Sequence, residues 1–317
     1  MGLLHLPSPS TVAVGAGVWA LFVADSSRLA PSLLKKLLAV LLVLNWKNLP
    51  GAWHLQVWKT VPEWWARAWH RGGEEKALAI AQDPFAVKSI TKGKVTLGDA
   101  DYNMHMSNST YARVSDAARF RMMLELIGPA FAAGVWSPLG ATSFSFYREI
   151  PLGAAYEMET RVLSWDDKWA SLPPPFMYCI TRFTTAPKRG QTERTLCCVA
   201  LFRLCFKLRG SRLTIPPSRV LSLSGLASSN GDRTNWERTL RLRAAGPKIV
   251  RKWLEYGGAV AARRQGKWPA EKELPAVPEG WTLEEWEKDG LEGVEEKRVE
   301  KLVVARRYGD TEEWKDL

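Results

Sequence analysis

Residues 98–111 read GDADYNMHMSNSTY, a stretch that places two carboxylates, Asp99 and Asp101, in a run of turn-forming residues. The residues at 107–109 (SNS) are all good helix N-caps. From residue 111 onwards, apolar side chains recur at helical spacing as far as Gly128-Pro129, where the pattern ends. The stretch therefore predicts a tight turn that carries Asp101, followed at once by a helix of about five turns whose apolar face fits a sheet.

Segments with strand character lie on both sides of this turn. Residues 194–208 are apolar on both faces, as in a central buried strand, whereas residues 169–184 are interrupted by three prolines that cannot sit inside a ladder. One strand, a long helix and then four antiparallel strands predict an α+β fold in which the helix packs on a curved sheet. The expected strands are residues 88–97, 141–149, 156–165, 169–184 and 194–208.

Composition excludes several classes of protein. With 46% hydrophobic and 24% charged residues among 317, the chain is neither disordered nor collagen-like. Its four cysteines lack metal-binding spacing and its four histidines are scattered, so we expect no metal site and no disulfide framework. The net charge of +11 lies in residues 1–226, because residues 227–317 hold 18 basic and 18 acidic residues. Without a long basic run or an RNA-binding motif, this charge favours anionic lipid or a polyanionic small molecule over nucleic acid.

The N-terminal residues predict attachment to a membrane. Thr11–Ala24 is an uncharged run of fourteen residues, and Leu37–Leu44 is a second apolar run. Both runs are shorter than the ~20 residues that a spanning helix needs. Six tryptophans follow between Trp46 and Trp69, mixed with lysine and arginine, which is the composition of a membrane–water interface. A helical lid over the main core is the alternative interpretation.

Three features favour a main domain that faces the cytoplasm. Basic residues follow the first apolar run, the cysteines have no evident pairing, and a glycan on the sequon at Asn108 would obstruct the turn. We divide the chain into a membrane-associated segment (1–75), a main α+β domain (76–215), a linker rich in Ser, Gly and Asn (216–235) and a charged helical extension (236–317).

The position of Asp101 suggests a chemistry. A carboxylate on a turn just before a helix start meets unpaired backbone N–H groups and the positive end of the helix dipole, which keep it ionised. The same N–H groups could polarise a carbonyl oxygen. This pairing suits hydrolysis of an activated acyl group, with Asp101 as general base or as nucleophile. The alternative is an aspartate that only caps a turn.

Residues 98–111 also resemble the signature of the hotdog-fold thioesterases, which runs Asp-x-Asp-x-x-Gly-His-Met-Asn-Asn before a long helix. The strand pattern of residues 143–169 is similar to that superfamily as well, most of all to the membrane-attached thioesterase superfamily member 6 branch and to fungal thioesterases of secondary-metabolite clusters. The resemblance covers roughly residues 85–208. The positions that match the signature are Asp99, Asp101, His105, Met106 and Asn108.

This resemblance implies a hotdog fold, in which a curved antiparallel sheet wraps a long helix. It implies hydrolysis of an acyl-CoA or acyl-carrier-protein thioester, releasing a fatty-acyl or polyketide-type acid, with coenzyme A as part of the substrate and no cofactor. The catalytic carboxylate falls on Asp101, and a homodimer with its sites at the subunit junction is expected. Candidate substrate-binding residues are His105, which could instead satisfy the turn, Asn108, Tyr111 and Arg148, which could meet a coenzyme A phosphate or simply be exposed.

Two departures from the signature leave a second function open. Met104 stands where the signature has glycine, and Ser107 replaces the first of the paired asparagines. A degenerate hotdog protein that binds acyl chains or scaffolds a membrane complex is therefore the alternative to the hydrolase. A hydratase or dehydratase ranks last, because the proline of its Asp-x-Asn-Pro motif is missing at position 104.

Overall fold

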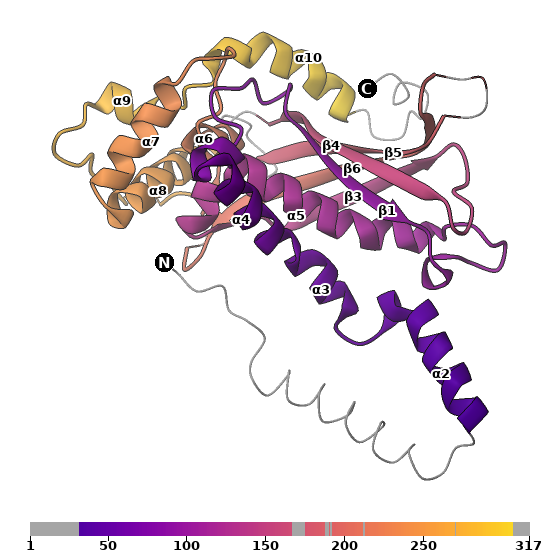
Figure 1. Ribbon diagram of the computed structural model, residues 1–317. Coiled ribbons are helices and arrows are strands. Elements are labelled where there is room, and N and C mark those ends of the chain that lie inside the picture. Colours follow the sequence, from indigo (N-terminus) through magenta and orange to yellow (C-terminus); the bar gives the residue numbers. More distant parts are fainter. Residues whose placement is uncertain are drawn as a thin grey trace.

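Helix α5 (Asn108–Ala132) lies across a curved antiparallel sheet in the computed structural model (Figure 1). The structure describes residues 32–306 except 167–174, 188–189, 191, 212 and 270. Within that part of the chain the sheet runs β1-β4-β5-β6-β2, with β3 and β7 also paired to β6. The strands are β1 (Lys88–Lys94), β2 (Val135–Trp136), β3 (Leu139–Phe146), β4 (Ala155–Trp165), β5 (Phe176–Thr185), β6 (Thr195–Leu208) and β7 (Thr214–Ile215).

This arrangement confirms the predicted long helix and the antiparallel strands after it. The alternating burial along β4 explains why the pattern was readable, since every second residue from Tyr156 to Val162 faces the helix. The long central strand β6 is buried on both faces over most of its length, as its apolar sequence predicted. A helix wrapped by such a sheet is the hotdog fold.

The predicted end of the long helix at Gly128-Pro129 is wrong. The backbone leaves helical geometry at Ile127 (φ −132°, ψ 25°), and the helix then continues to Ala132. Pro129 has no N–H to donate to the carbonyl of Glu125, which would be its helical partner. That carbonyl instead accepts a hydrogen bond from the N–H of Ala79, at 3.3 Å. The proline therefore bends the helix without ending it.

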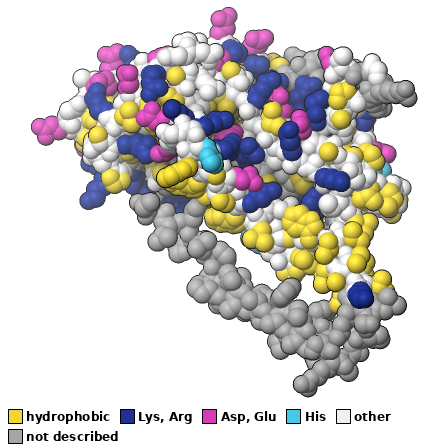
Figure 2. All heavy atoms as spheres, viewed as in Figure 1, with side chains coloured by type: hydrophobic (Ala, Val, Ile, Leu, Met, Phe, Trp, Pro, Cys, Tyr) yellow, Lys and Arg dark blue, Asp and Glu magenta, His cyan; other side chains and the backbone are white. Residues whose placement is uncertain are grey.

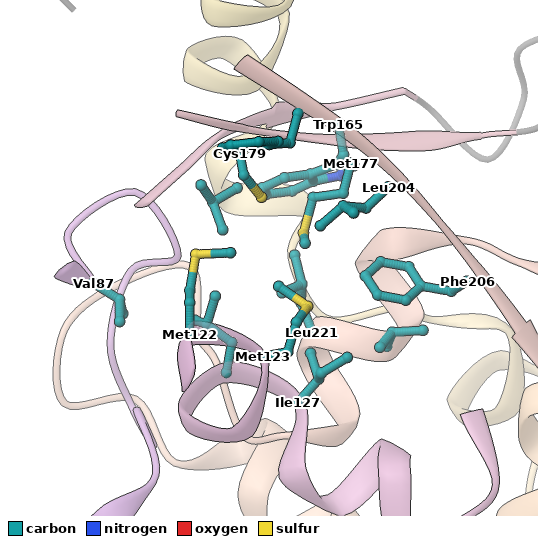
Figure 3. Packing of buried hydrophobic residues seen from close by; sticks show 14 of the residues in the cluster. Val87, Met122, Met123, Ile127, Trp165, Met177, Cys179, Leu204, Phe206 and Leu221 are labelled. Atoms are coloured by element: carbon teal, nitrogen blue, oxygen red, sulfur yellow. The ribbon is translucent and has the colours of Figure 1, made fainter. Parts of the chain in front are cut away.

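The core fills the space between α5 and the sheet. Figure 3 shows Met122, Met123 and Ile127 of α5 facing Trp165 and Met177 from the strands. Each of these side chains is at most 4% exposed, and burying such a side chain contributes about 1.5–3 kcal/mol. All four cysteines are free and buried. Burial raises the pKa of the thiols of Cys179, Cys198 and Cys205, as expected of core residues.

The stretch 216–235 was predicted to be a linker, but its residues 216–227 are part of the core, and only residues 229–234 are largely exposed. It contains helix α6 (Pro217–Leu223), whose Val220 and Leu221 are completely buried. The helices that follow pack against α6, and their Trp253 and Trp286 are also fully buried in the same apolar cluster. The C-terminal residues therefore complete the main domain rather than extend from it. These helices are α7 (Thr234–Ala244), α8 (Pro247–Arg264) and α9 (Leu283–Glu287).

Helix α10 (Glu295–Arg306) covers the outer face of the sheet, opposite α5 (Figure 1). Arg298 anchors it to β4, because its guanidinium donates a 2.6 Å hydrogen bond to the carbonyl of Trp165. In return, the hydroxyl of Ser164 donates to the carbonyl of Arg298 at 2.7 Å. The apolar residues beneath α10, which include Leu163 and Ile180, are shielded from water by this contact.

The N-terminal helices lead away from the domain. Helices α3 and α4 pack against α5, whereas α2 projects from the body of the molecule (Figure 1). No helix in the described part of the chain is long and apolar enough to cross a membrane. The run Thr11–Ala24 lies outside the described residues. These elements are α2 (Ser32–Leu44), the short helix η1 (Trp46–Asn48), α3 (Ala52–Trp58) and α4 (Thr60–Arg71), with further short helices at Glu74–Ala77 (η2), Leu97–Asp99 (η3) and Glu292–Val294 (η4).

Arg219 of α6 offers a test of the C-terminal packing. Its guanidinium is 1% exposed, donates to the carbonyls of Trp253 and Trp286, and lies 3.4 Å from Asp289. Burial lowers the pKa of Arg219 to about 10. We expect Arg219→Met to lower the free energy of unfolding by about 3–5 kcal/mol, because it removes the buried cation beside the Asp289 carboxylate and the donor to both carbonyls.

Urea unfolding followed by tryptophan fluorescence measures this effect. Arg233→Met is the control, because Arg233 pairs with Glu75 on the surface, where both side chains are 51% exposed, and its loss should cost less than about 1 kcal/mol. Equal stability of the Arg219 and Arg233 variants would show that the C-terminal helices do not depend on the buried guanidinium.

Candidate active site

Asp101 and His105 face each other across the tip of a tight hairpin. Ala100 and Met106 form a bridge at its base, and the N–H of Asp101 donates a 2.9 Å hydrogen bond to the carbonyl of His105. The N–H of Met104 closes the turn by donating to the carbonyl of Asp101 at 3.0 Å. The hairpin thus fixes the backbone of Asp101 on both sides, as the turn-rich sequence predicted.

Met104 adopts a backbone conformation that usually belongs to glycine. Its φ is +61°, in the left-handed region, and its side chain is 53% exposed. A residue in this conformation at the third position of a three-residue loop lets the hairpin close, and glycine is favoured there because it has no Cβ. This geometry explains why the thioesterase signature has glycine at this position. In this chain a largely exposed methionine side chain occupies this position.

The Asp101 carboxylate is held at one oxygen and approached at the other. Its Oδ1 accepts a 2.9 Å hydrogen bond from the N–H of Asn103, and its Oδ2 lies 3.4 Å from Nδ1 of His105. The Asp101 side chain remains 25% exposed. On the far side of the imidazole, Nε2 lies 3.4 Å from Oε1 of Glu149. A carboxylate that is oriented and still open to water can act as a base or a nucleophile.

Asp99, two residues earlier, has a different environment. It is 1% exposed, and its carboxylate contacts Nζ of Lys47 at 2.6 Å and Nη2 of Arg113 at 2.6 Å. The N–H and hydroxyl of Thr96 also donate to it, at 2.9 and 2.6 Å. Burial works to raise the pKa of Asp99, but the hydrogen bonds from Lys47 and Thr96 outweigh it and the pKa is lowered. Asp99 is therefore a structural carboxylate.

Helix α5 begins directly after the hairpin. The N–H of Ser107 donates to the carbonyl of Asp99 at 2.9 Å, which fixes the start of the helix against the turn. Ser107 makes no side-chain cap to the helix backbone; its hydroxyl contacts those of Ser109 and Thr110, each at 3.0 Å. Within the first turn of α5, the N–H of Thr110 donates to the carbonyl of Ser107 at 2.9 Å. The N–H groups of Asn108 and Ser109 have no side-chain cap from Ser107, and they can serve as donors to an oxyanion. Asn108 is exposed at this helix start.

The two remaining predicted substrate contacts lie apart from Asp101. Tyr111 is 2% exposed and makes edge contacts with Phe146 and Phe183, so it packs in the core behind the turn. Arg148 is exposed and lines an open hollow of about 640 Å³, together with Tyr147 and residues 192–196. Neither Asp101 nor His105 lines that hollow. Roles for Tyr111 and Arg148 in substrate binding stay predictions.

Sequence reasoning missed three residues that the fold brings to the turn. Glu149 reaches His105 because residues 150–152 pair with residues 104–106 through backbone hydrogen bonds. Lys47 and Arg113 reach Asp99 from η1 and from α5. Glu149, Lys47 and Arg113 all lie outside the quoted motif, so no sequence signal connected them to the turn. Their partner Asp99 could be found because it belongs to the signature.

The matched family model is the thioesterase-like superfamily, over residues 95–223. Thioesterase lcsJ of Purpureocillium lilacinum is 24% identical over 239 residues, covering 63% of this chain and 74% of that protein. Protein THEM6 of Danio rerio is 36% identical over 83 residues, which are 26% of this chain and 41% of that protein. Among solved structures, 4-hydroxybenzoyl CoA thioesterase from Pseudomonas sp. strain CBS-3 shows a TM-score of 0.35 and 16% identity, covering 42% of this chain and 94% of that one. The family-model match confirms the predicted resemblance to the thioesterases for residues 95–223.

The conformation of Met104 leads to a prediction about stability. A non-glycine residue in the left-handed region costs about 1–2 kcal/mol of folding free energy, which glycine would avoid. Glycine also loses more conformational entropy on folding than methionine does, and this offsets part of the stabilisation. Met104→Gly should therefore raise the free energy of unfolding by about 1 kcal/mol. Met104→Ala is the control, because it removes the side chain but keeps the Cβ. Calorimetric unfolding in which the alanine variant gains as much as the glycine variant would contradict the backbone explanation.

Proposed function

We infer from the membership of residues 95–223 in the thioesterase-like superfamily that this chain is a thioester hydrolase, and we propose Asp101 as its catalytic carboxylate. The observation that carries the proposal is the contrast between the two carboxylates of the turn. Asp99 is buried and fully engaged by cations and hydrogen-bond donors. Asp101 instead accepts a hydrogen bond from the N–H of Asn103, lies 3.4 Å from His105 and is 25% exposed.

The reaction requires a base or nucleophile and donors for the carbonyl oxygen. As a general base, Asp101 takes a proton from water, whose oxygen attacks the acyl carbon, and the sulfur leaves with its bonding electrons. As a nucleophile, Asp101 forms an anhydride with the acyl group, which water then hydrolyses. In both cases the first-turn N–H groups of α5 would stabilise the oxyanion. His105, between Asp101 and Glu149, would hold the carboxylate in place, and the scheme calls for no cofactor.

The proposed substrate is an acyl thioester of coenzyme A or of a carrier protein. Both thiols carry a phosphopantetheine arm, so a cationic side chain near the site would help to bind either one. Arg148 is the candidate for this contact, because it is exposed and is adjacent in the chain to Glu149, which reaches His105. The acid released would be a fatty-acyl or polyketide-type acid.

We further propose that two copies of the chain associate through β3. Strand β3 pairs only with β6 in the described part of the chain, so its outer edge has unpaired backbone groups. Leu139 and Phe146, at the two ends of β3, are 45% and 44% exposed. A second copy that pairs at this edge would extend the sheet and cover both side chains. The segment that follows β3 leads to Glu149, so such a dimer would bring its junction close to the turn.

We propose that the N-terminal helices rest on a membrane surface. Figure 2 shows hydrophobic side chains gathered at the lower right, over α2. At about 1.5 Å per residue, the thirteen residues of α2 are shorter than the hydrocarbon core, so the helix would lie in the interface rather than span it. The exposed apolar residues of this region, all at least 39% exposed, are Leu37, Val40, Leu41, Leu42, Val43, Leu44, Trp46, Trp53, Leu55, Trp65 and Trp69.

The proposed orientation places the catalytic domain on the cytoplasmic side. None of the four cysteines forms a disulfide in the structure, which suits a reducing compartment. Asn108, the acceptor of the sequon, is exposed at the first residue of α5, where a glycan would cover the proposed oxyanion donors. These two observations support the cytoplasmic side.

Met104 supports a second candidate function, binding of acyl chains without turnover. It puts a side chain, 53% exposed, at the position of the turn where the signature has glycine. If it blocks the approach of the thioester, the domain would retain an acyl ligand without hydrolysing it. Acyl-CoA binding at equilibrium, with no thiol released, would favour this function over the hydrolase.

The hydrolase proposal predicts the effect of Asp101→Asn. The amide keeps the shape of the side chain but cannot accept a proton or attack an acyl carbon, so kcat should fall about 10²–10⁴-fold. The measurement is thiol release from a panel of acyl-CoA and acyl-carrier-protein substrates, with unchanged circular dichroism as the check on folding. Asp232→Asn is the matched control, since Asp232 also accepts a turn hydrogen bond, from the N–H of Thr234 at 2.9 Å, just before a helix. Equal turnover by both variants would exclude Asp101 as the catalytic residue.

The membrane proposal predicts a loss of vesicle binding when the surface of α2 is made acidic. Replacing Leu37, Leu41 and Leu44 together by glutamate should weaken binding of the full chain to anionic vesicles at least 10-fold, because each leucine contributes about 1.5–3 kcal/mol when buried in lipid. The matched control carries glutamate at three apolar residues exposed elsewhere, Leu240, Val299 and Val303. Co-sedimentation in which the two triple variants bind equally would exclude α2 as the contact.

A further inference from the structure

We propose that Lys47, in the N-terminal segment, is a positioning residue for the active-site turn and acts through the buried carboxylate of Asp99. This proposal rests on the proposed role of Asp101. It assigns to the segment between α2 and α3 a function beyond attachment, because that segment supplies a charge that the turn needs.

The contact itself is short and shielded. Nζ of Lys47 lies 2.6 Å from Oδ2 of Asp99 and 2.8 Å from the carbonyl oxygen of Lys94 at the end of β1. The Lys47 side chain is only 12% exposed. It belongs to the three-residue helix η1, in which no residue as a whole is buried. A lysine stem that turns inward to place its ammonium on a buried carboxylate differs from the solvated lysines of a surface helix.

A second residue of η1 strengthens the link. The side-chain amide of Asn48 donates a 3.1 Å hydrogen bond to the carbonyl of Gly98, and its oxygen accepts from Arg113. Arg113 in turn donates to the carbonyl of Gly98 at 3.2 Å and to the carboxylate of Asp99 at 2.6 Å. The segment η1, the turn at Gly98-Asp99 and helix α5 are therefore joined in one polar network.

The network continues from Asp99 to the catalytic turn through the backbone. The carbonyl of Asp99 accepts the N–H of Ser107 at 2.9 Å and the hydroxyl of Thr110 at 3.0 Å, which ties it to the start of α5. The next residue, Ala100, forms the bridge to Met106 that closes the hairpin. Movement of Asp99 would thus displace both Asp101 and the N–H groups proposed to bind the oxyanion.

Charge makes Lys47 necessary in this network. A buried carboxylate destabilises the folded state unless cations and hydrogen-bond donors surround it. Removing one partner of a buried ion pair leaves the remaining charge without enough compensation. With Lys47 gone, the Thr96 donors would remain, but Arg113 would be the one cation left on Asp99 among the described residues, and its side chain is more exposed, at 27%. The turn would then shift towards water to solvate Asp99. A displacement of about 1 Å at a catalytic group can cost 10²-fold in rate.

The kinetic test compares three variants of the full chain. We expect Lys47→Met to lower kcat for acyl thioesters about 10- to 100-fold while KM changes less than about 3-fold, because the residue touches no substrate. Lys47→Arg should recover most of the rate, since it restores a cation. Lys36→Met is the control, because Lys36 carries the same charge on exposed α2. Equal kcat for Lys47→Met and Lys36→Met, or no recovery by Lys47→Arg, would overturn the proposal.

Hydrogen exchange tests the same link without relying on activity. Lys47→Met should speed exchange at least about 10-fold at the amides of Asp101, Met104 and Ser107, whose bonds hold the turn, and leave the amides of β5 and β6 unchanged. Lys36→Met should match the wild type at every position. Exchange in the turn that is unchanged by Lys47→Met would overturn the proposal even in a chain that hydrolyses nothing.

The two measurements also separate this proposal from the proposed function. A wild-type chain without turnover contradicts the hydrolase, and the exchange data still decide the role of Lys47. Turnover that depends on Asp101 but not on Lys47 contradicts only the positioning role. If Lys47→Met does not fold, Lys47→Gln keeps an N–H donor without the charge, and it should show a smaller change in the same direction.

Discussion

The buried charge of Asp99 is the constraint on which the geometry of the site depends. A carboxylate that is 1% exposed is stable only if cations and donors surround it, and here they come from three separate parts of the chain, with Lys47, Thr96 and Arg113 as the contributors. Satisfying one charge thereby brings the N-terminal segment, the end of β1 and helix α5 together. Because Asp99 carries this structural role, Asp101 is free to remain open to water, and two carboxylates in the same turn acquire different roles.

The sequence predicts the central helix and the strands well because their signals are local. Alternating burial in β4 and helical spacing in α5 can each be recognised within one segment. The errors involve partners that are distant in sequence. Residues 216–235 have the composition of an exposed linker, yet Trp253 and Trp286 cover α6 in the folded chain. In the same way, Pro129 looked like a helix terminator, and only the contact of Ala79 with the Glu125 carbonyl shows why the helix continues.

The candidate site shows the same difference between local sequence signals and contacts that are distant in sequence. The side chains of Asp101 and His105 belong to one hairpin, so a motif of a few residues was enough to place them together. Glu149 and Lys47 reach the hairpin through backbone pairing and through a separate helix, and no pattern in the sequence connects them to it. Tyr111 was a candidate substrate contact because it lies in the motif, but it also begins the apolar pattern of the helix, and in the structure it points into the core. The sequence could therefore predict which residues of the hairpin form the site. It could not predict which distant side chains reach the hairpin, or which way each side chain points.

The additions at both ends of the hotdog domain restrict how a second copy can approach it. One face of the sheet is occupied by α5, and α10 covers the other face over β4, where Arg298 bonds to the Trp165 carbonyl and Leu302 packs on the sheet. A copy that stacked on that outer face would meet α10 first. The edge of β3 remains unpaired in the described structure, and it leads through residue 149 to the turn that carries Asp101. Pairing at this edge therefore has a consequence that stacking lacks, since it would place the subunit junction next to His105 and Asp101.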